Sequence, residues 1–334
     1  MGGIRALKKI QLGKEDVAPG TAAAATVIWR GLGSLADNRE VTFPDETVGI
    51  LGGTDRSIVA KIAAAISFDN VNATFEQLPY VLSAGIVNTV TGVADGDSDG
   101  YVYTYTIPTS SQPTVKTYTI EGGDDQQAEE MEYAFVESFK LTGRGGEGLI
   151  LSANWLGRQV TNTTFTSLSL AAVEDILFGN CTLSIDAEGG TFGTTPVSST
   201  LLEVDLDFKT GLTPIWTANH LYFDTAQNTG PEIMLTMTYL HNSSAVTEKT
   251  NWRNETVRKV QLAWSGSDLT VGTGGSTYTT KMLIVNLPGK YEKFEALTDQ
   301  DGNDIVKCTL RSRYNVSDAT AGAIICVNKL SSLT

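Results

Sequence analysis

The chain has 334 residues, which is enough for two ordinary domains that each bury a core of their own. Hydrophobic residues make up 41% of it and charged residues 19%, with 33 glycines, so the composition excludes a disordered chain and favours a turn-rich β protein. The formal net charge of −14 excludes a general attraction to nucleic-acid phosphates. That charge indicates either an ordinary soluble protein or a surface that DNA passes without sticking.

The cysteines and the apolar segments argue against a secreted or membrane protein. Cys181, Cys308 and Cys326 are odd in number and widely spaced, so they predict no disulfide framework and fit a reducing cytoplasm. Within residues 1–20, Arg5, Lys8 and Lys9 are followed by no apolar stretch, so we expect no signal peptide. No apolar run approaches the length of a membrane span.

The first half of the sequence predicts a β-rich unit with one short helix. Thr74 and Gln77 have capping-box spacing, and apolar residues follow at helical spacing, which predicts a helix ending near Gly85. Pro79 weakens that interpretation, because proline past the first turn removes a backbone hydrogen bond. Residues 55–68 fit either a helical turn or a long loop with a strand, and the pattern does not decide between them. The other expected elements are strands over 24–30, 48–52, 86–93, 101–107, 117–120, 133–141 and 149–156, and a short helix over 171–178.

The second half holds the clearest strand of the sequence. Its residues alternate between apolar and charged, which predicts one buried and one solvated face: Leu202, Val204, Leu206 and Phe208 against Glu203, Asp205, Asp207 and Lys209. Residues 233–239 repeat this alternation. A helix is expected over 247–264, followed by strands over 281–287, 292–297 and 305–314.

A hairpin pattern occurs twice, over residues 132–160 and 281–314, and the order of strands, helix and hairpin is similar in both halves. We therefore predict a mainly β protein of two tandem β-sandwich domains, each with a flanking helix. The predicted divisions are an N-terminal arm with a first strand (1–39), a first domain (40–198), a second domain (199–315) and a C-terminal arm (316–334).

Three motifs suggest chemistry, and each has a simpler interpretation. Gly143, Gly145 and Gly148 match a dinucleotide fingerprint, but a strand follows them instead of a helix, so a hairpin turn is expected. Residues 95–100 match the first half of a calcium loop, but the twelfth position is Thr106 instead of glutamate, so an acidic hairpin turn is favoured. His220 and His241 have no metal-ligand spacing. The sequence therefore predicts no enzyme, cofactor or metal site.

Several phrases of the sequence resemble the major tail tube proteins of long-tailed, siphovirus-like bacteriophages. The resemblance covers about the first 160 residues and rests on packing and turn motifs, with the second half agreeing in pattern more than in letters. The phrases are Gly13-Lys14-Glu15, Gly20-Thr21, Ala25-Thr26, Trp29-Arg30-Gly31, Phe75-Glu76-Gln77-Leu78-Pro79, Tyr133-Ala134-Phe135, Leu151 and Asn154-Trp155-Leu156-Gly157.

The resemblance implies a β-sandwich whose inner strands join neighbouring subunits into a closed barrel. Rings of such subunits stack into the hollow tail tube of the virion, which is assembled in the host cytoplasm and through which DNA passes without specific binding. The repeated pattern favours a trimer with pseudo-sixfold symmetry over a hexamer. The implied partners are other copies of the chain and the tail terminator, tail tip and tape-measure proteins, with no membrane. The alternative is a non-viral tandem β-sandwich adhesin or carbohydrate-binding module.

Two sets of residues are candidates for the functional surfaces of such a tube. Glu203, Asp205 and Asp207 form a row of like charge that fits a wall facing DNA, or else a plain outer face. Candidate contacts between rings are residues 1–20, residues 316–334 and, more weakly, the acidic loop with Asp95, Asp97 and Asp99. Disordered tails are the alternative for the two termini.

Overall fold

The computed structural model describes residues 3–53 and 55–334, and in these residues the protein is mainly β. They form 22 strands, two α-helices and two short 3₁₀ helices. None of these helices has the length and apolar character needed to cross a membrane. Eighteen of the strands belong to one hydrogen-bonded system, and the other four form two small hairpins.

The elements up to residue 163 comprise twelve strands, one α-helix and one 3₁₀ helix. They are η1 (Arg5–Leu7), β1 (Lys9–Lys14), β2 (Val27–Ile28), β3 (Ala36–Asp37), β4 (Glu40–Thr42), β5 (Ile58–Lys61), β6 (Ala64–Asn72), α1 (Leu78–Gly85), β7 (Val93–Ala94), β8 (Tyr101–Thr106), β9 (Tyr118–Gly123), β10 (Ala128–Arg144), β11 (Ile150–Gly157) and β12 (Val160–Thr163).

The elements after residue 163 comprise ten strands, one α-helix and one 3₁₀ helix. They are η2 (Phe178–Asn180), β13 (Cys181–Ala187), β14 (Leu201–Lys209), β15 (Leu212–Ile215), β16 (Thr225–Asn228), β17 (Glu232–Leu240), α2 (Ser243–Arg253), β18 (Arg258–Asp268), β19 (Thr280–Phe294), β20 (Thr298–Gln300), β21 (Asn303–Ser312) and β22 (Ala323–Asn328).

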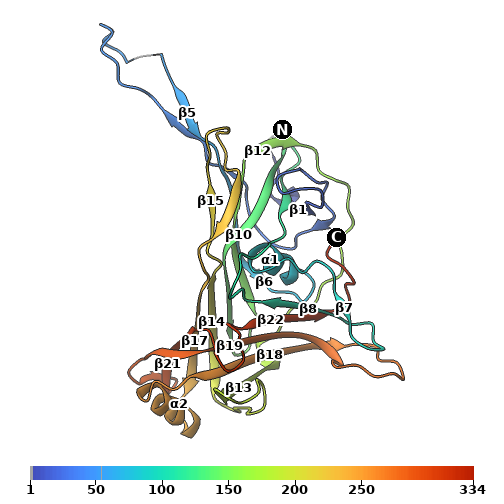
Figure 1. Cartoon of the computed structure of the whole chain (residues 1–334). Helices are drawn as coiled ribbons and strands as arrows, with labels where there is room; N and C mark the ends of the chain where they lie inside the picture. The colour runs from blue at the N-terminus through green and yellow to red at the C-terminus, as the bar shows by residue number, and fades with distance from the viewer. Residues whose placement is uncertain (1–2, 54) are drawn as a thin grey trace.

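A large antiparallel sheet of eight strands runs through both halves of the chain. Its order is β3-β6-β11-β10-β14-β17-β21-β19. The pairing of β10 with β14 joins the first half of the chain to the second, with Leu141 opposite Leu206. Figure 1 shows β10 and β14 standing beside one another, with the β4–β5 hairpin projecting from one end of the sheet.

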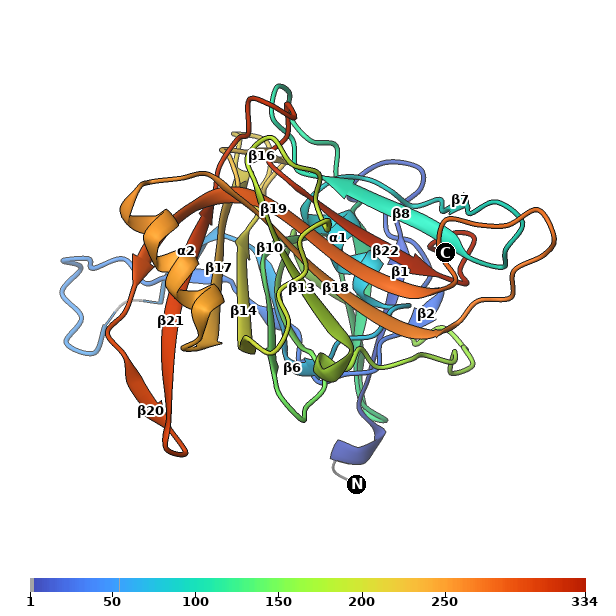
Figure 2. The same ribbon diagram turned by 90° about the horizontal axis from the view of Figure 1, so that it is seen from below.

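Two further sets of strands complete the fold, and the two longest strands belong to both a set and the large sheet. The N-terminal part of β10 pairs with β9 and β12, and β9 pairs with β1. The N-terminal part of β19 lies between β18 and β22, while β13 and β8 extend that set on its two sides. Figure 2 shows β18, β19, β22 and β8 running across the strands of the large sheet.

The pairings reveal an internal repeat of ten elements. In chain order, β1, β3, β4, β5, β6, α1, β9, β10, β11 and β12 correspond to β13, β14, β15, β16, β17, α2, β18, β19, β21 and β22. Every pairing among the first set recurs in the second: β3–β6 with β14–β17, β6–β11 with β17–β21, and β10–β12 with β19–β22 are examples. We call residues 9–163 unit 1 and residues 181–328 unit 2.

The two sides of the large sheet differ sharply in burial. Val204, Leu206 and Phe208 are at most 3% exposed and face the core, as their alternation predicts. Phe208 stacks on Phe139 of β10 with ring centroids 4.7 Å apart. Each buried side chain of this size contributes about 2 kcal/mol through removal of apolar surface from water. The core therefore continues across the junction between the units.

Several predicted elements are wrong in their type or extent. The residues from 247 to 264 are not one helix, because α2 ends at Arg253 and Glu255 takes a left-handed conformation (φ 54°) before β18 begins. Residues 171–177 are not helical, and 48–52 and 86–92 are not strands. Strand pairing also crosses the predicted domain boundary at 198/199, since β13 pairs with β18 and, in the large sheet, β10 pairs with β14.

The predicted C-terminal arm is also wrong. Residues 316–334 contain β22, which lies between β19 and β8, and Leu333 is fully buried. At the other terminus, β1 pairs along its whole length with β9, so residues 9–14 are part of a sheet and not of a free arm. The hairpin over 132–160 and the strand 101–107 are confirmed by β10–β11 and β8.

Candidate functional site

The outer face of the large sheet is polar and continuous across seven strands. Strand register places the following side chains on it, from β6 to β19: Ser67, Asn154, Ser152, Ser138, Lys140, Thr142, Arg144, Glu203, Asp205, Asp207, Lys209, Glu232, Thr236, Thr238, Lys307, Thr309, Arg311 and Lys290. We call this surface the polar face. The acidic row predicted from the sequence lies at its centre.

The acidic row is interleaved with cations and is not an isolated strip of negative charge. Lys140 Nζ lies 2.8 Å from Asp205 Oδ2, and Arg144 Nε lies 3.3 Å from Glu203 Oε1. Both cations come from β10, where register puts them directly beside β14. Such exposed pairs contribute about 0.5 kcal/mol each to stability. Their main effect is to make the polar face locally balanced in charge, although the whole chain is strongly acidic.

A second charged group extends the polar face towards β19. Lys209 Nζ lies 3.0 Å from Glu232 Oε2, and Arg311 bridges Glu232 at 3.2 Å and Glu292 at 2.9 Å. The hydrogen bond from Lys209 lowers the pKa of Glu232, and the hydrogen bond to Glu292 raises the pKa of Arg311. Glu232 and Arg311 therefore stay charged over the whole physiological range.

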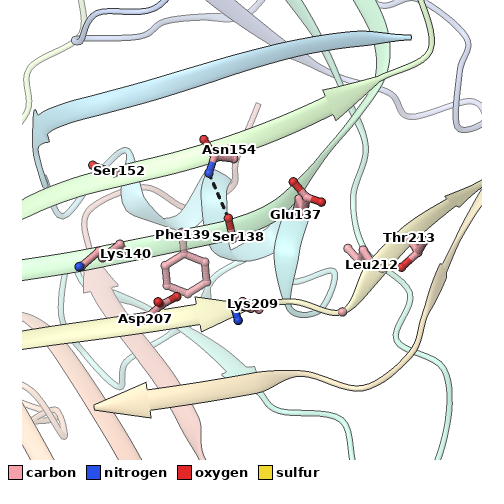
Figure 3. Close-up of a pocket in the computed structure, with 11 residues that line it drawn as sticks. Glu137, Ser138, Phe139, Lys140, Ser152, Asn154, Asp207, Lys209, Leu212 and Thr213 are labelled. Atoms are coloured by element: carbon pink, nitrogen blue, oxygen red, sulfur yellow. Dashed lines mark hydrogen bonds between the residues drawn. The ribbon is translucent and has the colours of Figure 1, made fainter. Parts of the chain in front are cut away.

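The polar face is hollowed near the middle of the sheet. A depression of about 550 Å³ lies over β10, β11 and β14 and is lined by Lys140, Asn154, Asp207 and Lys209 among others. Figure 3 shows these side chains on the same side of the strands, with Asn154 Nδ2 donating a hydrogen bond to Ser138 Oγ at 3.2 Å. A second depression of about 290 Å³ continues it along β14 past Arg144 and Glu203. Both are open troughs without a convergent set of catalytic groups.

An apolar hairpin projects from one end of the large sheet. It comprises β4, β5 and the described residues between them, and Figure 1 shows it extending far beyond the rest of the molecule. It carries seven of the 21 exposed large hydrophobic side chains of the described chain: Val41, Phe43, Val48, Ile50, Leu51, Ile58 and Val59. The sequence predicts only a short strand over 48–52 in this region, and sequence reasoning missed the projecting apolar surface.

The acidic loop that resembles a calcium site binds backbone amides instead. Asp95 accepts hydrogen bonds from the N–H groups of Thr277 at 3.0 Å and Tyr278 at 2.7 Å. Asp97 accepts from Gly274 N at 2.9 Å, and Asp99 accepts from Thr270 N at 2.8 Å. The three carboxylates thus hold the loop before β19, and Asp95 is only 6% exposed. Asp97 at the tip of the loop is exposed, and the role of this loop as a contact between rings stays a prediction.

The residues that carry the family resemblance gather in unit 1. The Glu15 carboxylate, 3% exposed, accepts hydrogen bonds from the N–H groups of Gly20 and Tyr133, both at 2.7 Å. Trp29 stacks on Phe68 with centroids 4.6 Å apart, and Phe68 contacts Trp155 at 5.8 Å. These motifs therefore fix how the N-terminal segment packs on β6, β10 and β11, and they are structural.

The remaining chemical motifs do not form a reactive site. Gly143, Gly145 and Gly148 lie at and beside the turn between β10 and β11, as predicted. Burial raises the pKa of the Cys181 thiol to about 12 and that of Cys308 even further, so neither is a ready nucleophile. Among the described residues, no group of three or more His, Cys, Asp or Glu side chains could hold a metal ion.

Comparison with known proteins adds no family assignment. No family model matches the chain, and no curated protein matches it significantly. The function is therefore argued from the polar face, the projecting hairpin and the internal repeat.

Proposed function

We propose that this protein is a structural subunit that assembles into stacked rings, forming the hollow tail tube through which the DNA of a long-tailed bacteriophage passes. The observation that carries the proposal is the large sheet, which is polar on one side and apolar on the other, and whose two edge strands have an unpaired edge among the described residues. An open strand edge is a template for pairing with another chain, and ring closure removes it. The tail-tube resemblance of unit 1 supports the same function.

The internal repeat supports a trimer over a hexamer. Two similar units in one chain give six units in a ring of three copies, which is pseudo-sixfold. Each copy would contribute its eight-stranded sheet to the wall of a closed barrel. The partners would be other copies of the chain, with the tail terminator, tail tip and tape-measure proteins at the ends and inside the tube.

The polar face is the proposed lining of the channel. Its mixture of paired acidic and basic side chains offers DNA phosphates no continuous basic track, so DNA would pass without being held. The apolar face cannot serve as the lining, because its side chains are buried in the core of the same chain. The proposal therefore replaces a purely acidic wall by a charge-balanced one.

The projecting hairpin is the proposed contact between successive rings. An isolated two-stranded hairpin is marginally stable in water, and seven exposed apolar side chains make burial against another molecule favourable. Since the hairpin leaves the end of the sheet and not its side, it points along the direction in which rings would stack (Figure 1). It takes the role that the sequence had suggested for residues 1–20, 316–334 and the loop of Asp95.

Electron microscopy of the concentrated protein tests the proposal, with hollow tubes of regular diameter as the expected result. Ile50→Ser combined with Leu51→Ser should raise the protein concentration needed to form tubes at least tenfold. The reason is that burial of each of these side chains contributes about 1.5 kcal/mol or more to the free energy of assembly. Leu170→Ser, at another exposed apolar position, is the matched control and should form tubes normally. A protein that stays monomeric at every concentration would support the adhesin or carbohydrate-binding alternative.

A further inference from the structure

The internal repeat leaves one strand of unit 2 without the partner that its counterpart has. In unit 1, the C-terminal part of β10 pairs on one edge with β11 and on the other with β14 of unit 2. In unit 2, the C-terminal part of β19 pairs with β21 on the edge equivalent to β11. Its other edge, from residue 290 onward, has no strand partner in the described chain.

The complementary half of this junction lies at the opposite end of the sheet. Strand β14 pairs with β17 on one side and β10 on the other. Its counterpart β3 pairs with β6, through Ala36 opposite Ala65, and has no strand on its other side among the residues that the structure describes. The chain therefore makes the β10–β14 junction once and presents both halves of the same junction at its two ends.

The backbone groups of both ends are oriented for such a junction. The N–H group of Asn38 donates to the carbonyl of Ala63, and the N–H group of Ala63 donates to the carbonyl of Asn38. Because backbone groups alternate in direction along a strand, the N–H and C=O groups of Asp37 point away from β6, to the open edge. Glu295 N donates a hydrogen bond to Lys307 O of β21. By the same alternation, the N–H and C=O groups of Phe294 point away from β21. In the junction within the chain, Thr210 N donates a hydrogen bond to Glu137 O. The backbone N–H and C=O groups of the even-numbered residues of β14 therefore point towards β10.

We propose that β3 of one copy pairs antiparallel with the extended segment 293–297 of the next, in the arrangement that β14 and β10 have within the chain. The partner is thus a second copy of this chain, bound head to tail. This inference rests on the proposed function, which requires copies of the chain to assemble, and it identifies the strands that join one copy to the next. Such heterologous joints close into a ring when the rotation per copy allows it.

The register of the joint follows from matching irregularities. The bulge of β10 between Val136 and Ser138 corresponds to the bulge of β19 between Tyr291 and Lys293, which makes Lys293 the counterpart of Ser138. Within the chain, Lys140 lies opposite Asp207. Glu295 is the counterpart of Lys140.

Following the same match across the sheet completes the register. Phe68 pairs with Ala153 as Met237 pairs with Cys308, so Ala65 corresponds to Met234. Ala36 pairs with Ala65 as Asp207 pairs with Met234, and Ala36 is therefore the counterpart of Asp207. Ala36 of one copy lies opposite Glu295 of the next.

The side chains of β3 fit this register with one difference from the internal junction. Leu35, partly buried against the core, is the counterpart of Leu206, and Ser34 and Ala36 face the solvent on the polar side. Asp37 takes the position of Phe208, so the joint buries less apolar surface than the internal junction does. The joint is therefore reversible and depends on concentration, whereas the internal junction is permanent.

Cysteine cross-linking between two differently tagged variants tests the joint. The Ala36–Glu295 pair is of the non-hydrogen-bonded kind, with Cα atoms about 4.5 Å apart, which is within the range of a disulfide. In a Cys181→Ser background, Ala36→Cys mixed with Glu295→Cys should give covalent dimers containing one of each tag on mild oxidation. Each variant alone should give at least tenfold fewer dimers. Equal yields from Ala36→Cys alone, or no mixed dimer, would overturn the joint.

A proline variant supplies the second measurement. Ala296→Pro removes an N–H group at the open edge, so it should lower the yield of mixed dimers at least tenfold when it is introduced into the Glu295→Cys chain. Ala296→Ser keeps that N–H group and should cross-link normally. Undiminished cross-linking by the proline variant would contradict the proposed pairing. If the protein forms tubes but the mixed dimers do not cross-link, the proposed joint is wrong and the tube function stands. If the mixed dimers cross-link but no tubes form, the joint stands and the tube function is wrong.

Discussion

Lys281 of β19 and Glu76, which lies two residues before the start of α1, form a buried ion pair across the two units, with Nζ 2.6 Å from Oε1. Both residues are at most 9% exposed. The same ammonium group lies 2.9 Å from Glu174 Oε2, and Glu174 also accepts hydrogen bonds from Ser267. One lysine therefore ties the helix of unit 1 and the linker between the units to the longest strand of unit 2.

Lys281→Ala should destabilise the protein by about 3 kcal/mol, because it leaves the Glu76 carboxylate buried without its cation. Chemical denaturation followed by tryptophan fluorescence measures this loss. The double variant Lys281→Met with Glu76→Gln should lose less than Lys281→Ala, since no unpaired buried charge remains. A double variant that is less stable than Lys281→Ala would show that the ion pair contributes net stability.

The same cluster predicts loss of stability in acid. Burial favours the neutral form of Glu174, but hydrogen bonds from Ser267 and Lys281 outweigh it and lower the pKa of the carboxyl group. A lowered folded-state pKa gives stability that is present above the ordinary pKa of about 4.5 and lost as the pH falls below it. Glu174→Gln should therefore flatten the fall in melting temperature below pH 4.5, and an unchanged fall would contradict this assignment.

Leu206→Asp should cost about 4 kcal/mol or more, because it places an unpaired charge between Leu141 and Leu235 in the core. The matched control is Asp207→Asn, one residue further along the same strand but on the polar face, which should change stability by about 0.5 kcal/mol at most. Thermal unfolding of the two variants gives the comparison. Equal effects would mean that β14 does not have one buried and one solvated side.

The Asp95 loop should be independent of calcium. Its carboxylates already accept backbone N–H groups from residues 270–278, so added calcium or a chelator should shift the melting temperature by about 1 °C at most. Asp95→Ala should still cost about 2 kcal/mol, because two partly buried backbone amides lose a charged acceptor. A calcium-dependent rise in melting temperature that Asp95→Ala abolishes would restore the metal-site interpretation.

The sequence predicts local features of this fold better than its long-range pairings. The strict alternation around Leu206 identifies β14 and its buried face, and the order of patterns in the two halves indicates the repeat. The helix expected up to Trp264 fails because the spacing of Trp252 and Val260 fits a helical face, while tertiary pairing with β13 and β19 makes residues 258–268 a strand. The position of β22 between strands from both halves has no local signal at all.

For the polar face, the sequence predicts which side chains of one strand share a side, but it does not predict which strand lies beside them. Alternation shows that Glu203, Asp205 and Asp207 share one side, but the cations that neutralise two of them come from β10, about sixty residues earlier in the chain. That neighbour is set by the junction of the units. The row of like charge lies on one side of β14, as the alternation predicts, and the cations beside it could not be seen from the strand alone.

Replacing Glu203, Asp205 and Asp207 by lysine tests whether the polar face lines the channel. The three side chains project from the solvated side of β14, so the variant should fold, while the row beside Lys140 and Arg144 becomes strongly basic. If the face lines the tube, assembled tubes should bind double-stranded DNA with an affinity that falls steeply with salt, because each neutralised phosphate releases counterions. The control replaces Asp299, Asp301 and Asp304 at the β20–β21 hairpin by lysine. It changes the net charge by the same amount and should not make tubes bind DNA. Equal DNA binding by unassembled subunits and tubes would place the row on the outer wall.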